Sequence, residues 1–272
     1  MRSIRNVSCA VIGAAGFIGS HLTDHLIEDR DCQVLAIDNL VAGRRDFVNS
    51  KAIFRHADIT GSEEYLRQLF REFDVSYCFN LAAWPYIVDS FSRPLHVFNV
   101  NATGAIKVIN AAQEAGCQGI MQWSSAELFG GASQSPTQHN GTLDEKSEVH
   151  PHSTYGAAKA AVDYYCQCAW KERKTPVIAL RQFNCVGERE THPYVVPEII
   201  SQLAVQQRFV KNSSHMKGLD KWQADDPGIV KLGNNSFRDF LYAGDAVRIA
   251  VELLERGQMG EVYNLGSETG IK

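Results

Sequence analysis

Short apolar segments alternate with longer segments of helical periodicity through the first two thirds of the chain. Residues 7–12 are mostly apolar, residues 17–28 repeat apolar positions with the period of a helix, and residues 33–37 are apolar again. This order predicts a strand, a helix and a second strand. Parallel strands that are joined by helices form a sheet covered on both faces. The pattern therefore predicts an α/β fold with a doubly wound, mostly parallel sheet.

The same alternation continues along the chain. It predicts further strands at residues 52–56, 76–81, 119–123 and 177–180, and helices at residues 63–72, 94–115 and 154–171. After residue 181 the pattern is less regular, with predicted helices at residues 195–205 and 243–255 and short strands at 229–232 and 237–241. Two polar segments, residues 130–150 and 211–228, are predicted to be loops beside a ligand cleft.

The length, net charge and cysteine content of the chain limit the kinds of molecule that it is expected to bind. The 272 residues suffice for one large domain or for a domain with a smaller lobe. A net charge of -4 gives no electrostatic footprint for nucleic acid or an anionic membrane. The seven cysteines are scattered without metal-ligand or secreted disulfide spacing, and no apolar run is long enough to span a bilayer. We therefore expect a cytoplasmic protein with no membrane or nucleic-acid partner.

Gly13, Gly16 and Gly19 lie between the first predicted strand and the first predicted helix. In this context backbone N–H groups and the helix N-terminus can receive a pyrophosphate where side chains would block it. The alternative is that the glycines serve only a tight turn. We favour a Rossmann-like, dinucleotide-binding domain over residues 1–181 and a smaller substrate-binding lobe over residues 182–272, interleaved with the first domain.

Asp38 closes the second strand about twenty residues after the glycine turn, where a carboxylate accepts ribose hydroxyls and repels a 2'-phosphate. This favours NAD over NADP, although Arg44 and Arg45 follow closely and either counter the repulsion or form a solvated loop. Asp58 either meets the adenine or caps the helix that begins at Glu63. The residues expected to contact NAD are Gly13, Gly16, Phe17, Ile18, Gly19, Asp38, Asn39, Asp58, Ile59, Leu81, Ala82 and Ala83, together with Tyr155 and Lys159.

Tyr155 and Lys159 are four residues apart on a predicted helix and therefore share one face. The ammonium of Lys159 is expected to stabilise the phenolate of Tyr155 and to lower its pKa from about 10. Such a phenolate accepts a proton near neutral pH. An alcohol that loses its proton to this base can pass a hydride to a nicotinamide, so the pair predicts a redox enzyme that acts on a secondary alcohol.

Several landmarks follow one another in a specific order: residues 13–19, Asp38, residues 80–83, Asn101, residues 124–130, 155–159, 181–184, 238–240 and 263–267. Together they resemble the extended short-chain dehydrogenase/reductases that modify nucleotide sugars, which include 4-epimerases, 4,6-dehydratases and UDP-glucuronate decarboxylases. The resemblance runs from about residue 7 to the last residue. It implies a nucleotide-diphosphate sugar as substrate, oxidised at C4 by a tightly held NAD that is later restored.

The resemblance also implies residue roles. By this resemblance Tyr155 is the base that takes the proton of the C4 hydroxyl. Lys159 is its electrostatic partner and also binds the NAD ribose, and Ser125 forms a hydrogen bond to the C4 oxygen. Ser125 alternatively caps a strand end. Asn184 and Arg238 match positions that hold the substrate's diphosphate, although Arg238 alternatively pairs with Asp239 or another acid. Asn101 is expected to position water or backbone.

Glu127 is the residue that distinguishes between the reactions catalysed within the resembled family. Its carboxylate can reach C5 of the sugar, and the proton there becomes acidic once C4 is a ketone, so Glu127 can start an elimination of the C6 hydroxyl. Ala126 departs from the pattern of the dehydratases, which place an acid or a serine there. A 4,6-dehydratase or a decarboxylase is favoured over a 4-epimerase, and a non-catalytic NAD-binding scaffold is a further alternative.

Two expectations concern assembly and extent. The helix predicted at residues 154–171 is apolar on nearly every face, so we expect a homodimer through this helix and the one at residues 94–115. The chain stops at Lys272, whereas members of the resembled family continue, so the substrate lobe is expected to be incomplete.

His21 and His25 have metal-binding spacing but no third ligand, and no metal site is expected.

Overall fold

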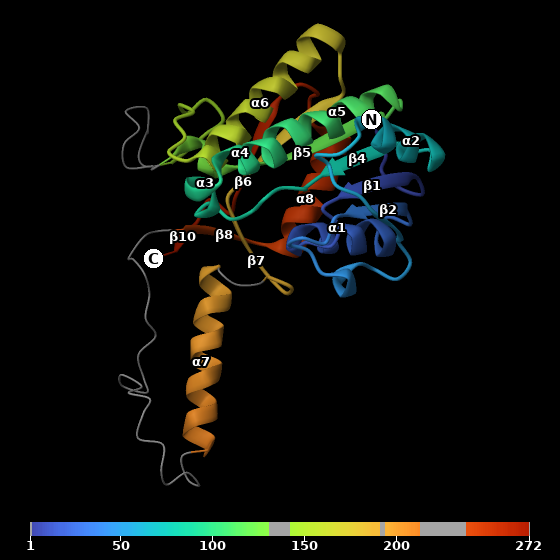
Figure 1. Cartoon of the computed structure of the whole chain (residues 1–272). Helices are drawn as coiled ribbons and strands as arrows, with labels where there is room; N and C mark the ends of the chain where they lie inside the picture. The colour runs from blue at the N-terminus through green and yellow to red at the C-terminus, as the bar shows by residue number, and fades with distance from the viewer. Residues whose placement is uncertain (1, 131–141, 191–193, 213–237, 272) are drawn as a thin grey trace.

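The computed structural model describes residues 2–130, 142–190, 194–212 and 238–271 (Figure 1). Its main sheet has seven strands in the order β3-β2-β1-β4-β5-β6-β9, and every recorded pairing is parallel. The strands are β1 (Ser8–Ile12), β2 (Gln33–Asp38), β3 (Ile53–His56), β4 (Tyr77–Asn80), β5 (Gly119–Ser125), β6 (Val177–Gln182) and β9 (Val262–Leu265). The predicted doubly wound, Rossmann-like α/β fold is confirmed.

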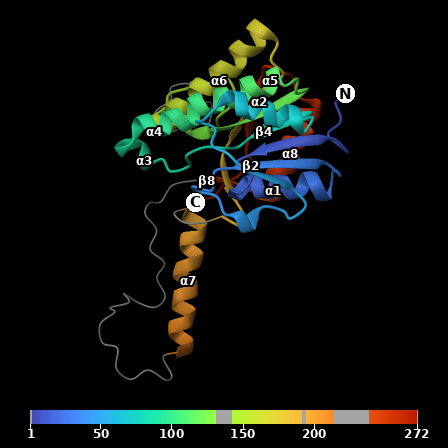
Figure 2. The ribbon, with the colours of Figure 1, turned by 45° about the vertical axis from the view of Figure 1, so that its right-hand side comes forward.

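Helices cover both faces of this sheet (Figure 2). On one face α1 (Phe17–Glu28) and α8 (Ala243–Arg256) pack over β1 and β5 through residues such as Leu22 and Ala250. On the other face α2 (Glu63–Glu72), α5 (Ala105–Glu114) and α6 (Thr154–Arg173) bury residues such as Leu66 and Val162. The helices predicted at residues 17–28 and 63–72 have the predicted ends.

The helix predicted at residues 94–115 consists of three consecutive segments. They are α4 (Pro94–Phe98), the π-helical turn η2 (Asn99–Gly104) and α5. A Cβ on Gly104 would lie 2.8 Å from the Ile59 side chain, so the wider turn brings the helix close to the loop after β3. A π-helical turn within an α-helix often marks a functional site.

Strands β5 and β6 each extend two residues beyond their predicted ends, to Ser125 and Gln182, which pair with each other. The last residues, including Ser124 and Arg181, are polar, so the apolar pattern ends before the strand does. β9 was not predicted as a strand because it is short and contains a polar residue, Asn264. It pairs with β6, so the chain returns to the main sheet near its end.

A smaller sheet has the order β10-β8-β7 and consists of β7 (Asn184–Val186), β8 (Arg238–Tyr242) and β10 (Gly270–Ile271). Helix α7 (Val195–Asn212) is longer than the predicted 195–205 and includes the first two residues of the loop predicted at 211–228. The strand predicted at 229–232 lies outside the described residues. Short helices α3 (Asp89–Ser92), η1 (Arg45–Phe47) and η3 (Ala126–Phe129) complete the elements.

The division at residue 181 stays a prediction, although β9 pairs within the main sheet and α8 packs on a face of that sheet. In the described part of the chain, no helix has the length and apolar character that crossing a membrane requires.

Candidate functional site

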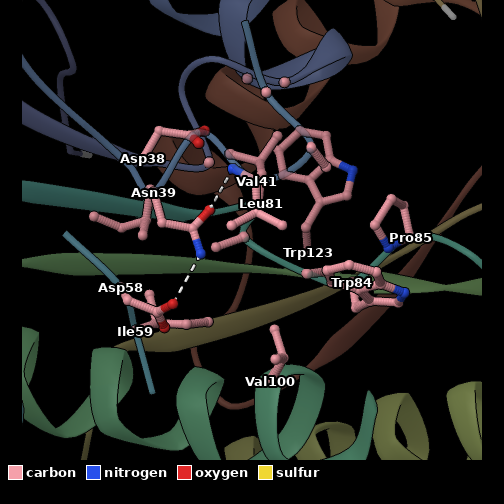
Figure 3. Close-up of a pocket in the computed structure, with 18 of the residues that line it drawn as sticks. Asp38, Asn39, Val41, Asp58, Ile59, Leu81, Trp84, Pro85, Val100 and Trp123 are labelled. Atoms are coloured by element: carbon pink, nitrogen blue, oxygen red, sulfur yellow. Dashed lines mark hydrogen bonds between the residues drawn. The ribbon is translucent and has the colours of Figure 1, made fainter. Parts of the chain in front are cut away.

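Two adjoining cavities open at the carboxyl ends of the parallel strands. The first encloses about 320 Å³ and the second about 410 Å³. They form one continuous cleft because they share the lining residues Phe17, Ile18, Leu81, Ala83, Pro85, Trp123 and Tyr194. In doubly wound sheets ligands bind at this edge. Figure 3 shows the first cavity, with Asp38, Asp58 and Trp84 around it.

The three glycines of the first turn have different roles. Gly13 has a φ of +85°, and a Cβ there would lie 2.8 Å from the backbone nitrogen of Ala82, at the end of β4. A Cβ on Gly19 would lie 2.0 Å from the carbonyl oxygen of Gly13. Gly16, in contrast, has no atom nearer than 3.3 Å to such a Cβ. The backbone therefore requires glycine at 13 and 19, whereas Gly16 is free of this constraint and lines the first cavity.

The N-terminus of α1 suits a pyrophosphate. Gly16 is the N-cap residue, and no described side chain caps the helix or places an acid in its first turn. The N–H groups of Phe17 and Ile18 belong to this first turn, where helix geometry provides no partner within the helix. Both residues line the first cavity, so these donors and the positive end of the helix dipole fit a bound diphosphate.

Asp38 ends β2 and lines the first cavity. Its carboxylate accepts hydrogen bonds from the backbone nitrogens of Ala15 at 2.9 Å and Leu40 at 2.8 Å, so it also fixes the glycine turn. A carboxylate has about four acceptor positions, so two remain for ribose hydroxyls. Arg44 pairs with Asp46 at 2.6 Å, and Arg45 stacks on Phe54. Both arginines thus have partners other than a 2'-phosphate.

The far end of the first cavity is formed by Asn39, Asp58 and Ile59. Asn39 donates to Asp58 at 2.9 Å, as Figure 3 shows. Asp58 is not the cap of α2, because Ser62 accepts the hydrogen bond from Tyr65 at that helix start. The alternative of a helix cap is therefore wrong, and Asp58 lies at the cavity, as do the other residues expected to contact NAD from Gly13 to Ala83.

Asn101 positions backbone, as predicted. It lies in the π-helical turn, where its side chain accepts from the Trp84 nitrogen at 2.6 Å and donates to the Trp84 oxygen at 3.1 Å. The Trp84 ring lies between Arg93 and His96 and donates to Asp89 at 2.8 Å. Trp84 is thus a fixed aromatic wall of the first cavity. The pattern of the sequence did not indicate it, because a loop tryptophan has no periodic signal.

Ser125, Glu127, Tyr155 and Lys159 line the second cavity together. Ser125 ends β5, and its hydroxyl accepts from the backbone nitrogen of Glu127 at 3.2 Å, so it also caps η3. Helix α6 carries Tyr155 and Lys159. It starts at Ser153, whose side chain accepts from the Gly156 nitrogen at 3.0 Å. Three elements thus bring the predicted catalytic residues into one space.

The pKa of Tyr155 contradicts the expected lowering. Burial raises this pKa, and the nearby Tyr194 and Glu127 act in the same direction, outweighing a hydrogen bond with Ser125 that lowers it. Lys159 donates to the carbonyl oxygen of Trp123 at 3.0 Å, and its Nζ lies 5.8 Å from the centre of the Tyr155 ring. Burial also lowers the pKa of Lys159 to about 8. In the protein alone the phenol therefore stays protonated at neutral pH.

Asn184 and Arg238 also line the second cavity. The Asn184 amide donates to the Asp239 carbonyl oxygen at 3.2 Å and so links β7 to β8. The carboxylate of Asp239 accepts from the backbone nitrogens of Ser267 at 2.7 Å and Glu268 at 3.1 Å. Asp239 therefore holds the loop after β9, and Arg238 extends from the neighbouring position on β8 to the cavity.

Glu190 and Tyr194 are lining residues that the sequence did not single out. Burial raises the pKa of Glu190 to about 7, and its Oε2 is buried with no hydrogen-bond partner among the described residues. Burial raises the pKa of Tyr194 to about 12. The segment around them is polar and aperiodic, so its position in the cleft left no signal in the sequence.

The histidine pair of α1 has ordinary partners. His21 contacts the Glu188 carbonyl oxygen at 2.8 Å, and His25 contacts Asp29 at 2.7 Å. Among the described residues no three or more His, Cys, Asp or Glu side chains gather as metal ligands would.

The sequence model of the NAD dependent epimerase/dehydratase family matches residues 9–266. The dTDP-D-glucose 4,6-dehydratase of Mus musculus is 30% identical over 264 residues, which are 94% of this chain and 67% of the mouse enzyme. The UDP-glucose 4-epimerase of Streptococcus mutans is 30% identical over 277 residues, 96% of this chain and 76% of that enzyme.

Among solved structures, the UDP-glucose 4-epimerase of Thermus thermophilus in complex with NAD superposes with a TM-score of 0.74 at 25% identity. The match covers 97% of this chain and 78% of that one. These similarities confirm the resemblance found in the sequence and the prediction of an enzyme that uses NAD. Because the family match spans nearly the whole chain, this protein belongs to the NAD dependent epimerase/dehydratase family.

Proposed function

We propose that this protein is an NAD-dependent nucleotide-sugar 4,6-dehydratase. The observation that carries the proposal is a single cavity lined by a phenol, Tyr155, and by two carboxyl groups, Glu127 and Glu190. A 4-epimerase needs the phenol to exchange a proton with the C4 oxygen, but it needs no base at C5 and no acid at C6. The carboxyl groups therefore favour dehydration.

The first cavity holds the cofactor in this proposal. The first turn of α1 binds the pyrophosphate, Asp38 accepts the adenosine ribose hydroxyls, and Ile59 lies at the adenine end. Ala82 and Ala83 let the backbone after β4 come close to the dinucleotide. NAD, when bound, supplies a hydride acceptor, later the hydride donor, and a positively charged ring beside Tyr155.

The second cavity carries out the proton transfers. Tyr155 takes the proton of the C4 hydroxyl, Ser125 donates a hydrogen bond to the C4 oxygen, and Lys159 stabilises the phenolate while binding the nicotinamide ribose. Burial of Tyr155 opposes its ionisation, so positive charge in the loaded cleft is required before the phenol can act as a base.

The elimination uses the two carboxyl groups. Glu127 removes the C5 proton next to the C4 ketone, and Glu190 donates its proton to the departing C6 hydroxyl, which leaves as water. C6 would then receive the hydride that C4 had lost, and Glu127 would return its proton to C5, which gives a 4-keto-6-deoxy sugar. A glutamate with a pKa near 7 is partly protonated at neutral pH, as a general acid must be. Glu190 would then perform the role for which Ala126 has no side-chain acid. Asn184 and Arg238 are placed to hold the substrate's diphosphate.

A 4-epimerase is the second candidate. The similarity to UDP-glucose 4-epimerases is as high as that to the dehydratases, and Ser125, Tyr155 and Lys159 serve both reactions. A panel of UDP-, GDP-, CDP- and dTDP-sugars, followed by mass spectrometry of the products, tests the proposal. Loss of water supports a dehydratase. Loss of carbon dioxide identifies a decarboxylase, a new isomer of unchanged mass identifies an epimerase, and no product from any sugar contradicts an enzyme of this class.

A second copy of this chain is the proposed partner. Large apolar side chains are exposed on three helices that contact one another, with Phe91 on α3 at 70%, Leu95 on α4 at 85% and Tyr164 on α6 at 54% exposure. Exposed apolar side chains gathered on neighbouring helices are typical of an interaction site. Leu95 and Tyr164 lie on the two helical segments from which the sequence predicted a homodimer, Phe91 lies just before the first of them, and an isologous contact would cover all three.

Glu127→Gln is expected to reduce dehydration about 100-fold or more, because the amide cannot remove the C5 proton. Oxidation at C4 should persist, seen as absorbance of the reduced nicotinamide after substrate is added. Glu261→Gln, an exposed position outside both cavities, is the control. Retention of full dehydration by Glu127→Gln would remove Glu127 from the mechanism.

Glu190→Gln is expected to lower the rate of water loss about 100-fold and to change the pH profile of kcat. A required acid is active below its pKa, so the native rate should fall as pH rises through about 7. The variant should lack this decline. Glu188→Gln, in the same loop but outside both cavities, should keep the native profile. An unchanged profile in Glu190→Gln contradicts the assigned role.

Gly16→Ala is expected to weaken NAD binding about tenfold or more, a change of roughly 1.4 kcal/mol, because the methyl group enters the first cavity. The fold should persist, since Gly16 has a φ of -80° and a Cβ there would lie 3.3 Å from the Gly13 carbonyl oxygen, a tight contact that needs only a small shift. Gly19→Ala should instead lose thermal stability. Calorimetric titration with NAD and thermal unfolding separate the two effects, and equal NAD affinity in Gly16→Ala and the native protein would contradict the placement.

Leu95→Glu is expected to convert a dimer into a monomer, because a charge in the centre of the apolar patch would be buried by the second copy. Light scattering at micromolar protein measures the mass. Leu203→Glu, an exposed apolar position on α7, is the matched control. A native protein that is already a monomer would exclude this interface.

A further inference from the structure

Asp163 and Arg181 form a buried ion pair that the proposed chemistry does not use. The carboxylate of Asp163 on α6 is 1% exposed, the guanidinium of Arg181 on β6 is 3% exposed, and Nε lies 2.7 Å from Oδ2. Burying two charges costs free energy that a good pair only roughly offsets. Such a pair is therefore poor support for stability alone, and its position beside the cleft suggests another role.

Asp163 lies one turn beyond Lys159 and two turns beyond Tyr155 on the same face of α6. The end of β5 follows these three side chains. The Trp123 carbonyl oxygen on β5 accepts from Lys159 at 3.0 Å, and Arg181 on the adjacent strand β6 donates to Asp163 at 2.7 Å. Two neighbouring strands thus hold two successive turns of one helix.

Arg181 is itself held from several sides. Its Nη1 donates to the Glu145 carbonyl oxygen at 3.0 Å, and its Cζ lies 5.2 Å from the centre of the Phe129 ring. Phe129 ends η3, the turn that carries Glu127. Burial raises the pKa of Asp163 above its usual range, and the hydrogen bond from Arg181 together with the charges of Arg181 and Lys159 opposes this rise. Arg181 therefore keeps the carboxylate in place and favours its ionised form.

We propose that Asp163, held by Arg181, is a positioning residue that keeps Lys159 charged beneath the cleft. The inference rests on the proposed role of Lys159 beside Tyr155. Burial lowers the pKa of Lys159, and the charge of Asp163 is the cause that opposes it. Three other titratable side chains line the second cavity with Lys159: Tyr155, Glu127 and Tyr194. Three more lie around Trp84, in the segment that contains α3 and α4: Asp89, Arg93 and His96.

Asp163→Asn tests the proposal through the titration of Lys159 itself. Reductive methylation with formaldehyde and borohydride modifies only the neutral amine, and peptide mass spectrometry measures the extent at Lys159 as pH is varied. Removing a nearby anion destabilises the ammonium, so the midpoint should fall by about one pH unit. At a pH below both midpoints, labelling of Lys159 should then rise about tenfold.

Matched variants separate this effect from loss of structure. Glu255→Gln alters another largely buried pair, with Arg30, far from the cleft, and should leave the midpoint unchanged. Should Asp163→Asn fail to fold with Arg181 left unpaired, the double variant Asp163→Asn, Arg181→Met removes both charges and should show the same shift. A native midpoint in the folded Asp163 variant overturns the proposal.

The labelling needs no substrate. An unchanged midpoint therefore rejects the role of Asp163 alone, whereas a panel of nucleotide sugars without turnover rejects the proposed function alone.

Discussion

The close contact between the end of β5 and one face of α6 is the constraint on which the site depends. Gly156 lets α6 approach η3, the turn that directly follows β5, because a Cβ there would lie 2.7 Å from the carbonyl oxygen of Glu127. Because the segments come this close, Lys159 in the second turn of α6 can donate a hydrogen bond to the Trp123 carbonyl oxygen near the end of β5. Tyr155 and Lys159 then face the cleft, and the ion pair of Asp163 and Arg181 lies behind them.

Burial decides the electrostatics of this contact. It raises the pKa of Tyr155 and lowers that of Lys159 to about 8, so both groups are shifted toward their neutral forms. A protein that needed a permanent phenolate would be poorly served by such a site. A protein that needs the phenolate only when a cationic ligand is present benefits, because the base remains inactive until the cleft is loaded.

Periodicity in the sequence predicted the alternation of strands and helices along the first half of the chain and the ends of α1 and α2, because their apolar positions face the sheet. It failed where strand ends turn polar, as at Ser125 and Gln182, and where a short strand contains Asn264. The lowered pKa expected for Tyr155 was wrong because spacing on a helix reveals a neighbouring charge but not the loss of water. Glu190 and Trp84 lie on loops, whose approach to the cleft depends on the whole fold.

Fold and family leave the reaction undecided, because dehydratases and epimerases are equally similar to this chain. In the mechanism proposed here, the glycine turn and the residues of β5 and α6 serve the oxidation at C4, with which either reaction begins. The difference must therefore lie in groups that act after the ketone forms. Among the described residues, the carboxyl groups lining the second cavity are Glu127 and Glu190, and the proposed elimination gives each of them a proton to transfer.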